Sequence, residues 1–239
     1  MIKNGIILSG GNGSRLSPIN ESLNKHMIPI GNKFIIDYPL MTMQEMGVEN
    51  LTIVLGGNFF EQVVKYIKGG KAWNFNINYV YQETPAGIAQ AIDLCKDYVG
   101  DDKFSVCLGD NWFEKPVIWK DLPGAQVVLH KHPHLQQFGV ASIKDGKIMK
   151  IEEKPSAIYY SFDNYAIAGC YLFDQMFFEY FKDSKPSRRG EYEITEIIEK
   201  YNKADMLNWT IVDGGWSDMG TFDSIGFVSD YIYTKNKVY

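Results

Sequence analysis

Cysteines and long apolar runs are scarce in this sequence of 239 residues. The three cysteines, Cys95, Cys107 and Cys170, lie far apart, without the spacing of a disulfide framework or a zinc knuckle. Buried thiols in a reducing compartment are therefore expected. No apolar run approaches the length of a transmembrane span. The chain passes from Met1 almost directly into an apolar segment, which argues against a secretory signal. We expect a cytoplasmic protein with no membrane partner.

An excess of basic charge is also lacking. The chain has 24 lysines and arginines against 29 aspartates and glutamates, which gives a net charge of −5. That balance argues against a nucleic-acid partner, although a few local cations suffice for a single nucleotide. Hydrophobic residues make up 45% and aromatic residues 14% of the chain, which is enough for a sizeable folded core.

Two common phosphate-binding motifs are missing. No run supplies the Gly-Lys-Ser/Thr end of a Walker loop, and Leu16 stands where a dinucleotide fingerprint starting at Gly11 needs its third glycine. A nicotinamide oxidoreductase is therefore disfavoured. The surroundings of Ser14, Ser105 and Ser217 are not those of a nucleophile elbow, which disfavours hydrolase chemistry.

A glycine-rich turn followed by two cations is present near the amino terminus. A short apolar run leads into Gly10, Gly11 and Gly13, and Arg15 and Lys25 come after them. Glycines let backbone N–H groups approach an anion, Arg15 offers a fork of donors to phosphate oxygens, and Lys25 adds a compact charge. The pattern indicates a triphosphate-binding loop. The alternative is a structural turn with a solvated arginine.

Apolar periodicity predicts alternating strands and helices over the first half of the chain. Expected strands cover 4–9, 51–55, 77–82 and 104–108, and expected helices cover 34–46, 59–67 and 86–94. Such alternation indicates a parallel sheet covered by helices on both faces, with ligand sites at the carboxyl ends of the strands.

The second half is richer in strands. Strands are expected at 127–132, 140–143, 148–152, 165–173 and 207–212, helices at 175–182 and 191–203, and a closing helix capped by Thr221. The predicted class is α/β: a Rossmann-like, mostly parallel central sheet flanked by helices, with a smaller β-rich part. We expect one domain over 1–239, with its halves meeting at about residue 125, hence 1–125 and 126–239.

Two aspartates stand where a metal could bind. Asp110 comes directly after a predicted strand, and Asp218 lies in a glycine-rich turn. Carboxylates in such loops suit Mg²⁺, and together with Arg15 and Lys25 they would form a site for phosphoryl or nucleotidyl transfer if all four converge. The alternative is that both are turn residues.

Two further polar clusters lie at strand ends. Glu153 could accept hydrogen bonds from sugar hydroxyls, and Lys154 could meet a sugar phosphate; the alternative is a charged strand end. His130, His132 and His134 alternate, so a metal pair is one interpretation and a solvated strand exit is the favoured one.

Several of these motifs stand in an order shared with one enzyme family. They are residues 10–18 with Lys25, 82–91, 108–111, 138–140, 152–155, 164–169, 189–195 and 216–221. On these motifs the chain resembles the sugar-1-phosphate nucleotidyltransferases, and most closely the glucose-1-phosphate thymidylyltransferases among them. The resemblance covers nearly the whole chain.

The resemblance implies a role for each matching residue. Arg15, on the departing pyrophosphate, and Lys25, between the phosphates of the two substrates, would be catalytic. The nucleotide would be held by Gly10, Gly11, Gly13, Ser14, Gln82 and Gly87, with Gln82 and Gly87 reading the base. In the second half, Asn111, Gly139, Glu153 and Ile167 would contact a hexose, and Lys154 and Arg189 its phosphate. Asp110 and Asp218 would hold Mg²⁺.

The reaction implied is a Mg²⁺-dependent transfer of a nucleotidyl group from dTTP or UTP to glucose-1-phosphate or a related hexose-1-phosphate. It would yield a nucleotide-sugar, such as a polysaccharide precursor, and pyrophosphate. A cytidylyl- or guanylyltransferase acting on another sugar phosphate stays open as an alternative. So does a non-catalytic nucleotide-sugar-binding paralogue, although Arg15, Lys25, Asp110 and Asp218 are all present.

Some positions depart from the family pattern. Phe138 and Ala168 stand where tyrosine and threonine are usual, so the sugar is less defined than the nucleotide. The sequence ends at Tyr239, before the family's helical segment that helps to form a tetramer and an effector site. We therefore expect weak or absent feedback inhibition through that site. A homo-oligomer, either a dimer or a tetramer, is expected.

Overall fold

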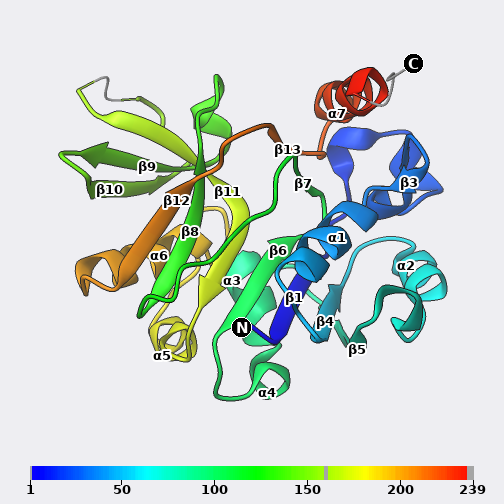
Figure 1. The fold of residues 1–239 in the computed structure, drawn as a ribbon, viewed down its shortest axis with the longest axis horizontal. Helices are drawn as coiled ribbons and strands as arrows, with labels where there is room; N and C mark the ends of the chain where they lie inside the picture. Colours follow the sequence, from blue (N-terminus) through cyan, green and yellow to red (C-terminus); the bar gives the residue numbers. More distant parts are fainter. Residues whose placement is uncertain (1, 159–160, 236–239) are drawn as a thin grey trace.

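One mixed sheet of nine strands organises the protein (Figure 1). The computed structural model describes residues 2–158 and 161–235. Within them the sheet contains β1 (Asn4–Ser9), β4 (Asn50–Leu55), β5 (Asn76–Tyr81), β6 (Phe104–Leu108), β8 (Ala125–His130), β9 (Gly139–Lys144), β10 (Lys147–Glu153), β11 (Asp163–Phe173) and β12 (Leu207–Ile211). The main order is β10-β9-β11-β6-β1-β4-β5, with β8 beside β11 and β12 beside β8.

The first half of the chain supplies the parallel strands β6, β1, β4 and β5. Ile6 and Ile7 are neighbours in β1, and both are fully buried, as expected for a strand that is covered on both faces. Because β1 and β6 are parallel neighbours, the loops after them meet at one edge. The N–H of Gly109 donates to the carbonyl oxygen of Leu8 at 2.9 Å and ties these loops together.

Helices cover both faces of the sheet (Figure 1). One face packs against α3 (Ile88–Asp93), α4 (Lys96–Val99), α5 (Met176–Lys182) and α6 (Ile194–Lys203), and the other against α1 (Asp37–Glu45) and α2 (Phe60–Ile67). Phe104 lies at the centre of the first core, where its ring contacts those of Phe173, Phe177 and Phe178.

The long strand β11 joins strands of the two halves of the chain, and its neighbours β9 and β6 separate along its length. β8 lies along one side of β11; on the other side, residues 163–166 pair with β9 and residues 170–173 with β6. In the described structure, residues 167–169 pair with neither β9 nor β6. The N–H of Gly169 donates instead to Asn111 Oδ1 at 3.1 Å. The sheet therefore splays at this point, beside the carboxyl end of β6.

Two short ribbons complete the described structure. β7 (Asn111–Phe113) pairs with β13 (Trp216–Asp218), and β2 (Pro29–Ile30) pairs with β3 (Lys33–Phe34). The first ribbon sets Asp218 opposite Asn111. It thus brings the late glycine-rich turn to the end of β6, although the two segments are far apart in the sequence.

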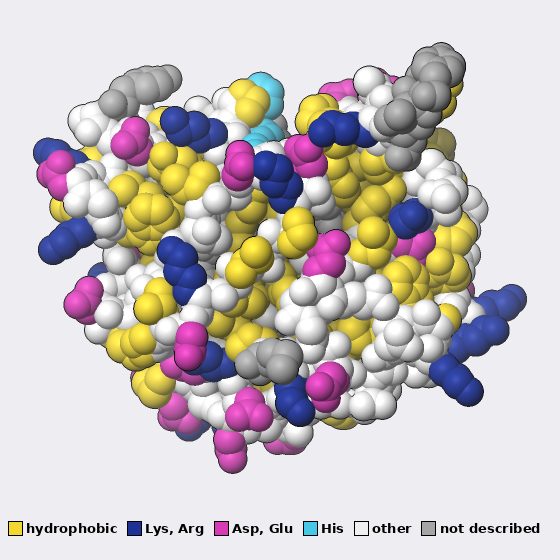
Figure 2. All heavy atoms as spheres, in the orientation of Figure 1, with side chains coloured by type: hydrophobic (Ala, Val, Ile, Leu, Met, Phe, Trp, Pro, Cys, Tyr) yellow, Lys and Arg dark blue, Asp and Glu magenta, His cyan; other side chains and the backbone are white. Residues whose placement is uncertain are grey.

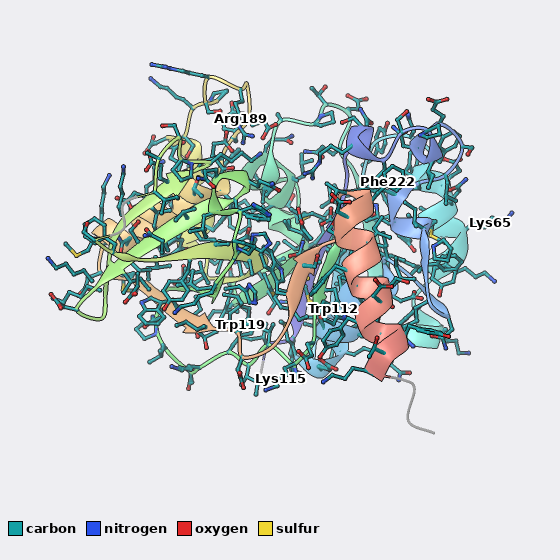
Figure 3. All side chains as sticks on the ribbon, turned by 90° about the horizontal axis from the view of Figure 1, so that it is seen from above. Lys65, Trp112, Lys115, Trp119, Arg189 and Phe222 are labelled. Carbon is teal, nitrogen blue, oxygen red and sulfur yellow. The ribbon has the colours of Figure 1, made fainter. Side chains whose placement is uncertain are left out.

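The closing helix α7 (Phe222–Lys235) packs on the loops of the amino-terminal half. The hydroxyl of Thr221 accepts a hydrogen bond from the N–H of Ser224 at 3.2 Å, which confirms the predicted cap. Trp112 lies beside α7 (Figure 3), and its ring contacts that of Tyr231 at 5.0 Å. Phe227 is 53% exposed.

The surface mixes charges of both signs with apolar side chains on the face drawn in Figure 2. In the described part of the chain, no helix combines the length and apolar character needed to cross a membrane.

The predicted α/β class is confirmed, although the element boundaries and the sheet differ in detail. The sheet is more mixed than predicted, because β9, β10 and β11 join it through antiparallel pairs. The helix predicted at 34–46 begins at Asp37, because Phe34 belongs to β3 and its N–H donates to Asp37 Oδ2 at 2.8 Å. The helix predicted at 191–203 begins at Ile194, because Glu193 has an extended backbone and its carboxylate binds residues of the preceding loop.

The splay in β11 predicts that residue 169 tolerates no side chain. A Cβ there would lie 2.6 Å from Leu108 Cδ1 and 2.7 Å from Asn111 Oδ1. Gly169→Ala is expected to lower the free energy of unfolding by about 1–3 kcal/mol through overpacking. Urea denaturation measures this change. The matched control is Gly226→Ala in α7, where a Cβ meets nothing within 4 Å, and a gain of about 0.5–1 kcal/mol is expected. Equal effects of the two substitutions would contradict the packing described here.

Candidate functional site

Two adjoining cavities open at the carboxyl edge of the parallel strands. The larger has a volume of about 570 Å³ and the smaller about 250 Å³. Their walls share Ile88, Leu108, Asp110 and Glu191. Two cavities that meet at one carboxylate can hold two ligands side by side.

Nearly all the residues selected from the sequence line one of these cavities. The smaller cavity is bordered by Gly10, Gly11, Lys25, Gln82 and Gly87. The larger is bordered by Ser14, Arg15, Asn111, Gly139, Glu153, Lys154, Ile167, Arg189 and Asp218. Asp110 borders both, and Gly13 borders neither.

A buried ion pair stands where the cavities meet. Lys25 Nζ lies 2.6 Å from Asp110 Oδ2, and the two side chains are only 15% and 14% exposed. Burial by itself would raise the pKa of Asp110, but the charge of Lys25, the adjacent His26 and the hydrogen bonds from Lys25 and Asn111 together outweigh burial and hold that pKa at about 2. Asp110 is therefore a carboxylate at any physiological pH.

His26, the residue after Lys25, lies buried beside this pair. Its Nδ1 lies 3.0 Å from Ser9 Oγ and 2.9 Å from Asn24 Oδ1, and its side chain is fully buried. Burial and the adjacent Lys25 lower the pKa of His26 to about 3, so the ring is neutral. Asn24 in turn binds the carbonyl oxygen of Asn58, which anchors the lysine-bearing turn to the loop before α2.

Asp218 is the second carboxylate of the site. The N–H of Met219 donates to the carbonyl oxygen of Asp110 at 2.7 Å, and Arg15 Nη2 lies 3.9 Å from Asp218 Oδ2. Burial and the nearby charge of Asp110 raise the pKa of Asp218 to about 6. The two aspartates thus have similar surroundings but opposite pKa shifts, because Lys25 pairs with Asp110 alone.

The two aspartates fit a divalent cation. Their negative charges repel each other, and a bound cation would reduce this repulsion. Among residues 2–158 and 161–235, no group of three or more histidines, cysteines, aspartates and glutamates is arranged to hold a metal. A site of two carboxylates suits Mg²⁺, which keeps several waters and takes further ligands from substrate phosphates.

The glycine-rich turn borders the smaller cavity through Gly10 and Gly11 and the larger cavity through Ser14 and Arg15. Gly11 and Gly13 adopt φ angles of 92° and 58°, in the region that favours glycine. A Cβ at residue 13 would lie 3.2 Å from Lys25 Cβ, so Gly13 makes room for the lysine and does not itself line a cavity. The side chain of Arg15 is 59% exposed, which leaves it available to an incoming anion.

The side chain of Asn111 makes three hydrogen bonds to neighbouring residues. Its Nδ2 donates to Asp110 Oδ1 at 3.0 Å, and its Oδ1 accepts from Trp216 Nε1 at 2.7 Å and from the N–H of Gly169 at 3.1 Å. Asn111 is also completely buried. Its side chain therefore orients Asp110 and joins β7, β13 and β11.

Charged side chains border the larger cavity around Arg189, which is labelled in Figure 3. Arg189 Nη2 lies 2.7 Å from Glu193 Oε2, 3.0 Å from Glu191 Oε2 and 3.4 Å from Glu153 Oε1. Lys154 Nζ lies 4.0 Å from the same Glu153 oxygen. Burial and the charge of Glu193 raise the pKa of Glu153. Two cations therefore converge on one partly buried carboxylate.

Two glycines bring these segments close together. Gly139 pairs with Glu153 across β9 and β10, and a Cβ on it would lie 2.6 Å from Thr195 Cγ2. Gly87 has a φ of 102°, and a Cβ on it would lie 2.6 Å from the carbonyl oxygen of Tyr192. Glycine at both positions lets Tyr192 and Thr195 pack closely against the walls of the two cavities.

Comparison with known proteins assigns the chain to a family. Residues 4–234 match the family described as nucleotidyl transferase. The chain belongs to the nucleotidyl transferase family.

Named members of this family resemble most of the chain. It is 31% identical over 239 residues to a glucose-1-phosphate thymidylyltransferase of Mycolicibacterium smegmatis, covering 96% of this chain and 82% of the relative. It is 33% identical over 231 residues to the low-salt glycan biosynthesis nucleotidyltransferase Agl11 of Haloferax volcanii, covering 92% of this chain and 63% of that relative, which is less than two thirds of its length. The predicted resemblance is thereby confirmed.

A solved structure agrees with this assignment. A crystal structure assigned as a glucose-1-phosphate thymidylyltransferase from Bacillus anthracis, in complex with sucrose, superimposes with a TM-score of 0.89. The two chains are 37% identical, and the match covers 97% of this chain and 95% of that one. A UDP-glucose pyrophosphorylase bound to UDP-glucose shares the fold, with a TM-score of 0.83 at 23% identity.

Several residues around these cavities had no role predicted from the sequence. Glu191, Glu193 and Thr195 lie within the motif 189–195, but their convergence on Arg189 and Glu153 depends on the chain path between β10 and α6. Trp216 lies in a predicted motif too, and it binds Asn111. The rings of His130 and His132 pack against Trp216, with centroids 5.6 and 5.9 Å away.

The raised pKa of Asp218 predicts a pH-dependent cost to folding. Well below pH 4 the residue is protonated in both the folded and the unfolded chain, so it does not change the free energy of unfolding. Above its folded pKa of about 6 it is charged in both, and its burial lowers the free energy of unfolding by the full amount. Without divalent cations, Asp218→Asn is expected to raise the free energy of unfolding by about 1–3 kcal/mol at pH 8 and to have little effect near pH 4. Urea denaturation with a chelator, at both pH values, measures the difference. Equal stability of the two proteins at pH 8 would contradict the assignment.

Proposed function

We propose that this protein transfers a nucleotidyl group from dTTP or UTP to glucose-1-phosphate or a related hexose-1-phosphate, with Mg²⁺ and release of pyrophosphate. The observation that carries the proposal is that Asp110, paired with Lys25 at 2.6 Å, lines both cavities. Membership of the nucleotidyl transferase family supports the reaction class. The named thymidylyltransferases among its relatives favour a thymidine or uridine nucleotide.

The smaller cavity is assigned to the nucleotide base and the larger to the sugar phosphate. Gln82, on the wall of the smaller cavity, offers an amide that can pair with the edge of a base. The larger cavity carries Glu153 for hydroxyl groups and Lys154 and Arg189 for a phosphate. The phosphates of both ligands would then meet beside Asp110 and Lys25.

The reaction needs no protein nucleophile. A phosphate oxygen of the sugar phosphate attacks the α-phosphorus of the nucleotide in line, the bond from that phosphorus to the bridging oxygen breaks, and its electron pair leaves with pyrophosphate. Lys25 neutralises charge between the phosphates, and Arg15 receives the departing pyrophosphate. Asp110 and Asp218 would hold Mg²⁺, which when bound adds further charge neutralisation.

Arg189 would exchange partners when the sugar phosphate binds. A phosphate offers this guanidinium a paired, bidentate contact. That contact would replace part of its present network with Glu191 and Glu193, whose distances are 3.0 and 2.7 Å. Asn111 would act on the reaction by orienting the carboxylate of Asp110.

The direct test is pyrophosphate release by the purified protein. Mg²⁺, glucose-1-phosphate and one of dTTP, UTP, CTP, GTP or ATP are supplied, and release that requires the sugar phosphate is expected with dTTP or UTP. Asp110→Asn is expected to lower turnover by about 100-fold or more, in the range found when one charge-stabilising group is removed from an active site. Galactose-, mannose- and N-acetylglucosamine-1-phosphate then define the sugar.

The matched control is Asp213→Asn, which removes an aspartate that is 92% exposed, pairs with Lys115 and lines neither cavity. This variant is expected to keep wild-type turnover. Release with CTP or GTP in place of dTTP and UTP would select the alternative transferases. No release with any pair of substrates would overturn the proposed activity.

A further inference from the structure

The side-chain amide of Gln82 donates a hydrogen bond to a second glutamine. Gln82 is 5% exposed, and its Nε2 donates to Gln90 Oε1 at 2.6 Å. Gln90 lies on α3 and lines neither cavity, whereas Gln82 lines the smaller one. Any effect of Gln90 on a ligand in that cavity must therefore pass through Gln82.

The position of Gln82 is fixed independently of this contact. Its backbone N–H donates to the carbonyl oxygen of Leu55 at 2.9 Å, so the residue continues the pairing of β4 with β5. A Cβ on Gly10 would lie 2.9 Å from Gln82 Oε1, so the amide packs closely beneath the glycine-rich turn. The remaining choice is the rotation of the terminal amide, which decides the positions of Oε1 and Nε2.

This orientation matters chemically because the two ends of an amide have the same shape and opposite hydrogen-bonding character. In thymine and uracil the ring nitrogen N3 carries a hydrogen and donates, whereas in cytosine N3 accepts. An amide whose nitrogen is turned toward Gln90 carries its oxygen on the other side, and an oxygen that faces the base there suits the N3–H of thymine or uracil. The reversed amide would present an N–H, which suits cytosine.

We propose that Gln90 is a positioning residue that selects the pyrimidine: by accepting the Gln82 Nε2–H, it leaves Gln82 Oε1 to receive the N3–H of thymine or uracil and so disfavours cytosine. This rests on the proposed function in placing the base in the smaller cavity. Cavity shape alone does not separate uracil from cytosine, which have nearly the same shape and differ only in the group on C4 and the hydrogen on N3. The hydrogen bond from Gln82 to Gln90 supplies the missing discrimination.

Two substitutions of nearly equal size test the proposal. Gln90→Glu can only accept a hydrogen bond, so it preserves the observed orientation; Gln90→Met has a similar length and holds the amide in neither orientation. Dissociation constants for dTTP, UTP and CTP, measured by calorimetry without sugar phosphate, give the selectivity. Wild type and Gln90→Glu are expected to prefer dTTP or UTP over CTP. In Gln90→Met that preference is expected to fall by about tenfold, in part through tighter CTP binding.

A control variant separates this effect from general damage. Gln44→Met removes an exposed glutamine on α1 whose Nε2 donates to the carbonyl oxygen of Trp73, and it is expected to leave the selectivity unchanged. Circular dichroism checks that each variant is folded. If Gln90→Met does not fold, Gln90→Glu still decides, because a lost or reversed preference in that variant contradicts the proposal.

The outcomes distinguish this proposal from the proposed function. Selective binding of dTTP or UTP without pyrophosphate release would overturn the activity and leave the role of Gln90 measurable. An unchanged selectivity in folded Gln90→Met would overturn the role of Gln90 whatever the activity. Equal binding of all three nucleotides by the wild type, or binding of none, would also overturn it.

Discussion

The rest of the site depends on one buried ion pair, between Lys25 and Asp110. Lys25 comes from the turn after β1 and Asp110 from the loop after β6, and these strands are parallel neighbours, so the pair closes the gap between their carboxyl ends. Asp110 also lies on the wall common to both cavities, and Lys25 lines the smaller one. A charge buried here without its partner would be strongly destabilising, which makes the pair a structural requirement as well as a chemical one.

Around this pair the protein keeps two carboxylates close together whose pKa values are shifted in opposite directions. Asp110 has a cation at 2.6 Å and a pKa of about 2, whereas Asp218, with Arg15 at 3.9 Å, has a pKa of about 6. The ribbon of β7 and β13 forces this proximity. The unfavourable charge on Asp218 would favour a bound cation, and the surrounding fold maintains this strain.

The sequence predicted the parts of this arrangement that depend on local pattern. The apolar runs of β1, β4 and β6 and the turn of Gly10 to Arg15 are readable from periodicity and glycine placement. Motif order in addition indicated which residues belong to one site. The pairing of Asn111 with Trp216, the carboxylates around Arg189 and the contact of Gln82 with Gln90 were not predictable. They join segments through tertiary packing, on which local periodicity carries no information.

The central claim is that two substrates lie side by side across Asp110 and react directly, without a nucleotidyl group passing through the protein. The stereochemistry at the transferred phosphorus tests it most directly. A nucleoside α-thiotriphosphate of known configuration is supplied with the sugar phosphate, and the configuration of the product is read by phosphorus NMR. The account predicts inversion, the result of a single in-line displacement. Retention would require a covalent nucleotidyl-protein intermediate and would contradict it.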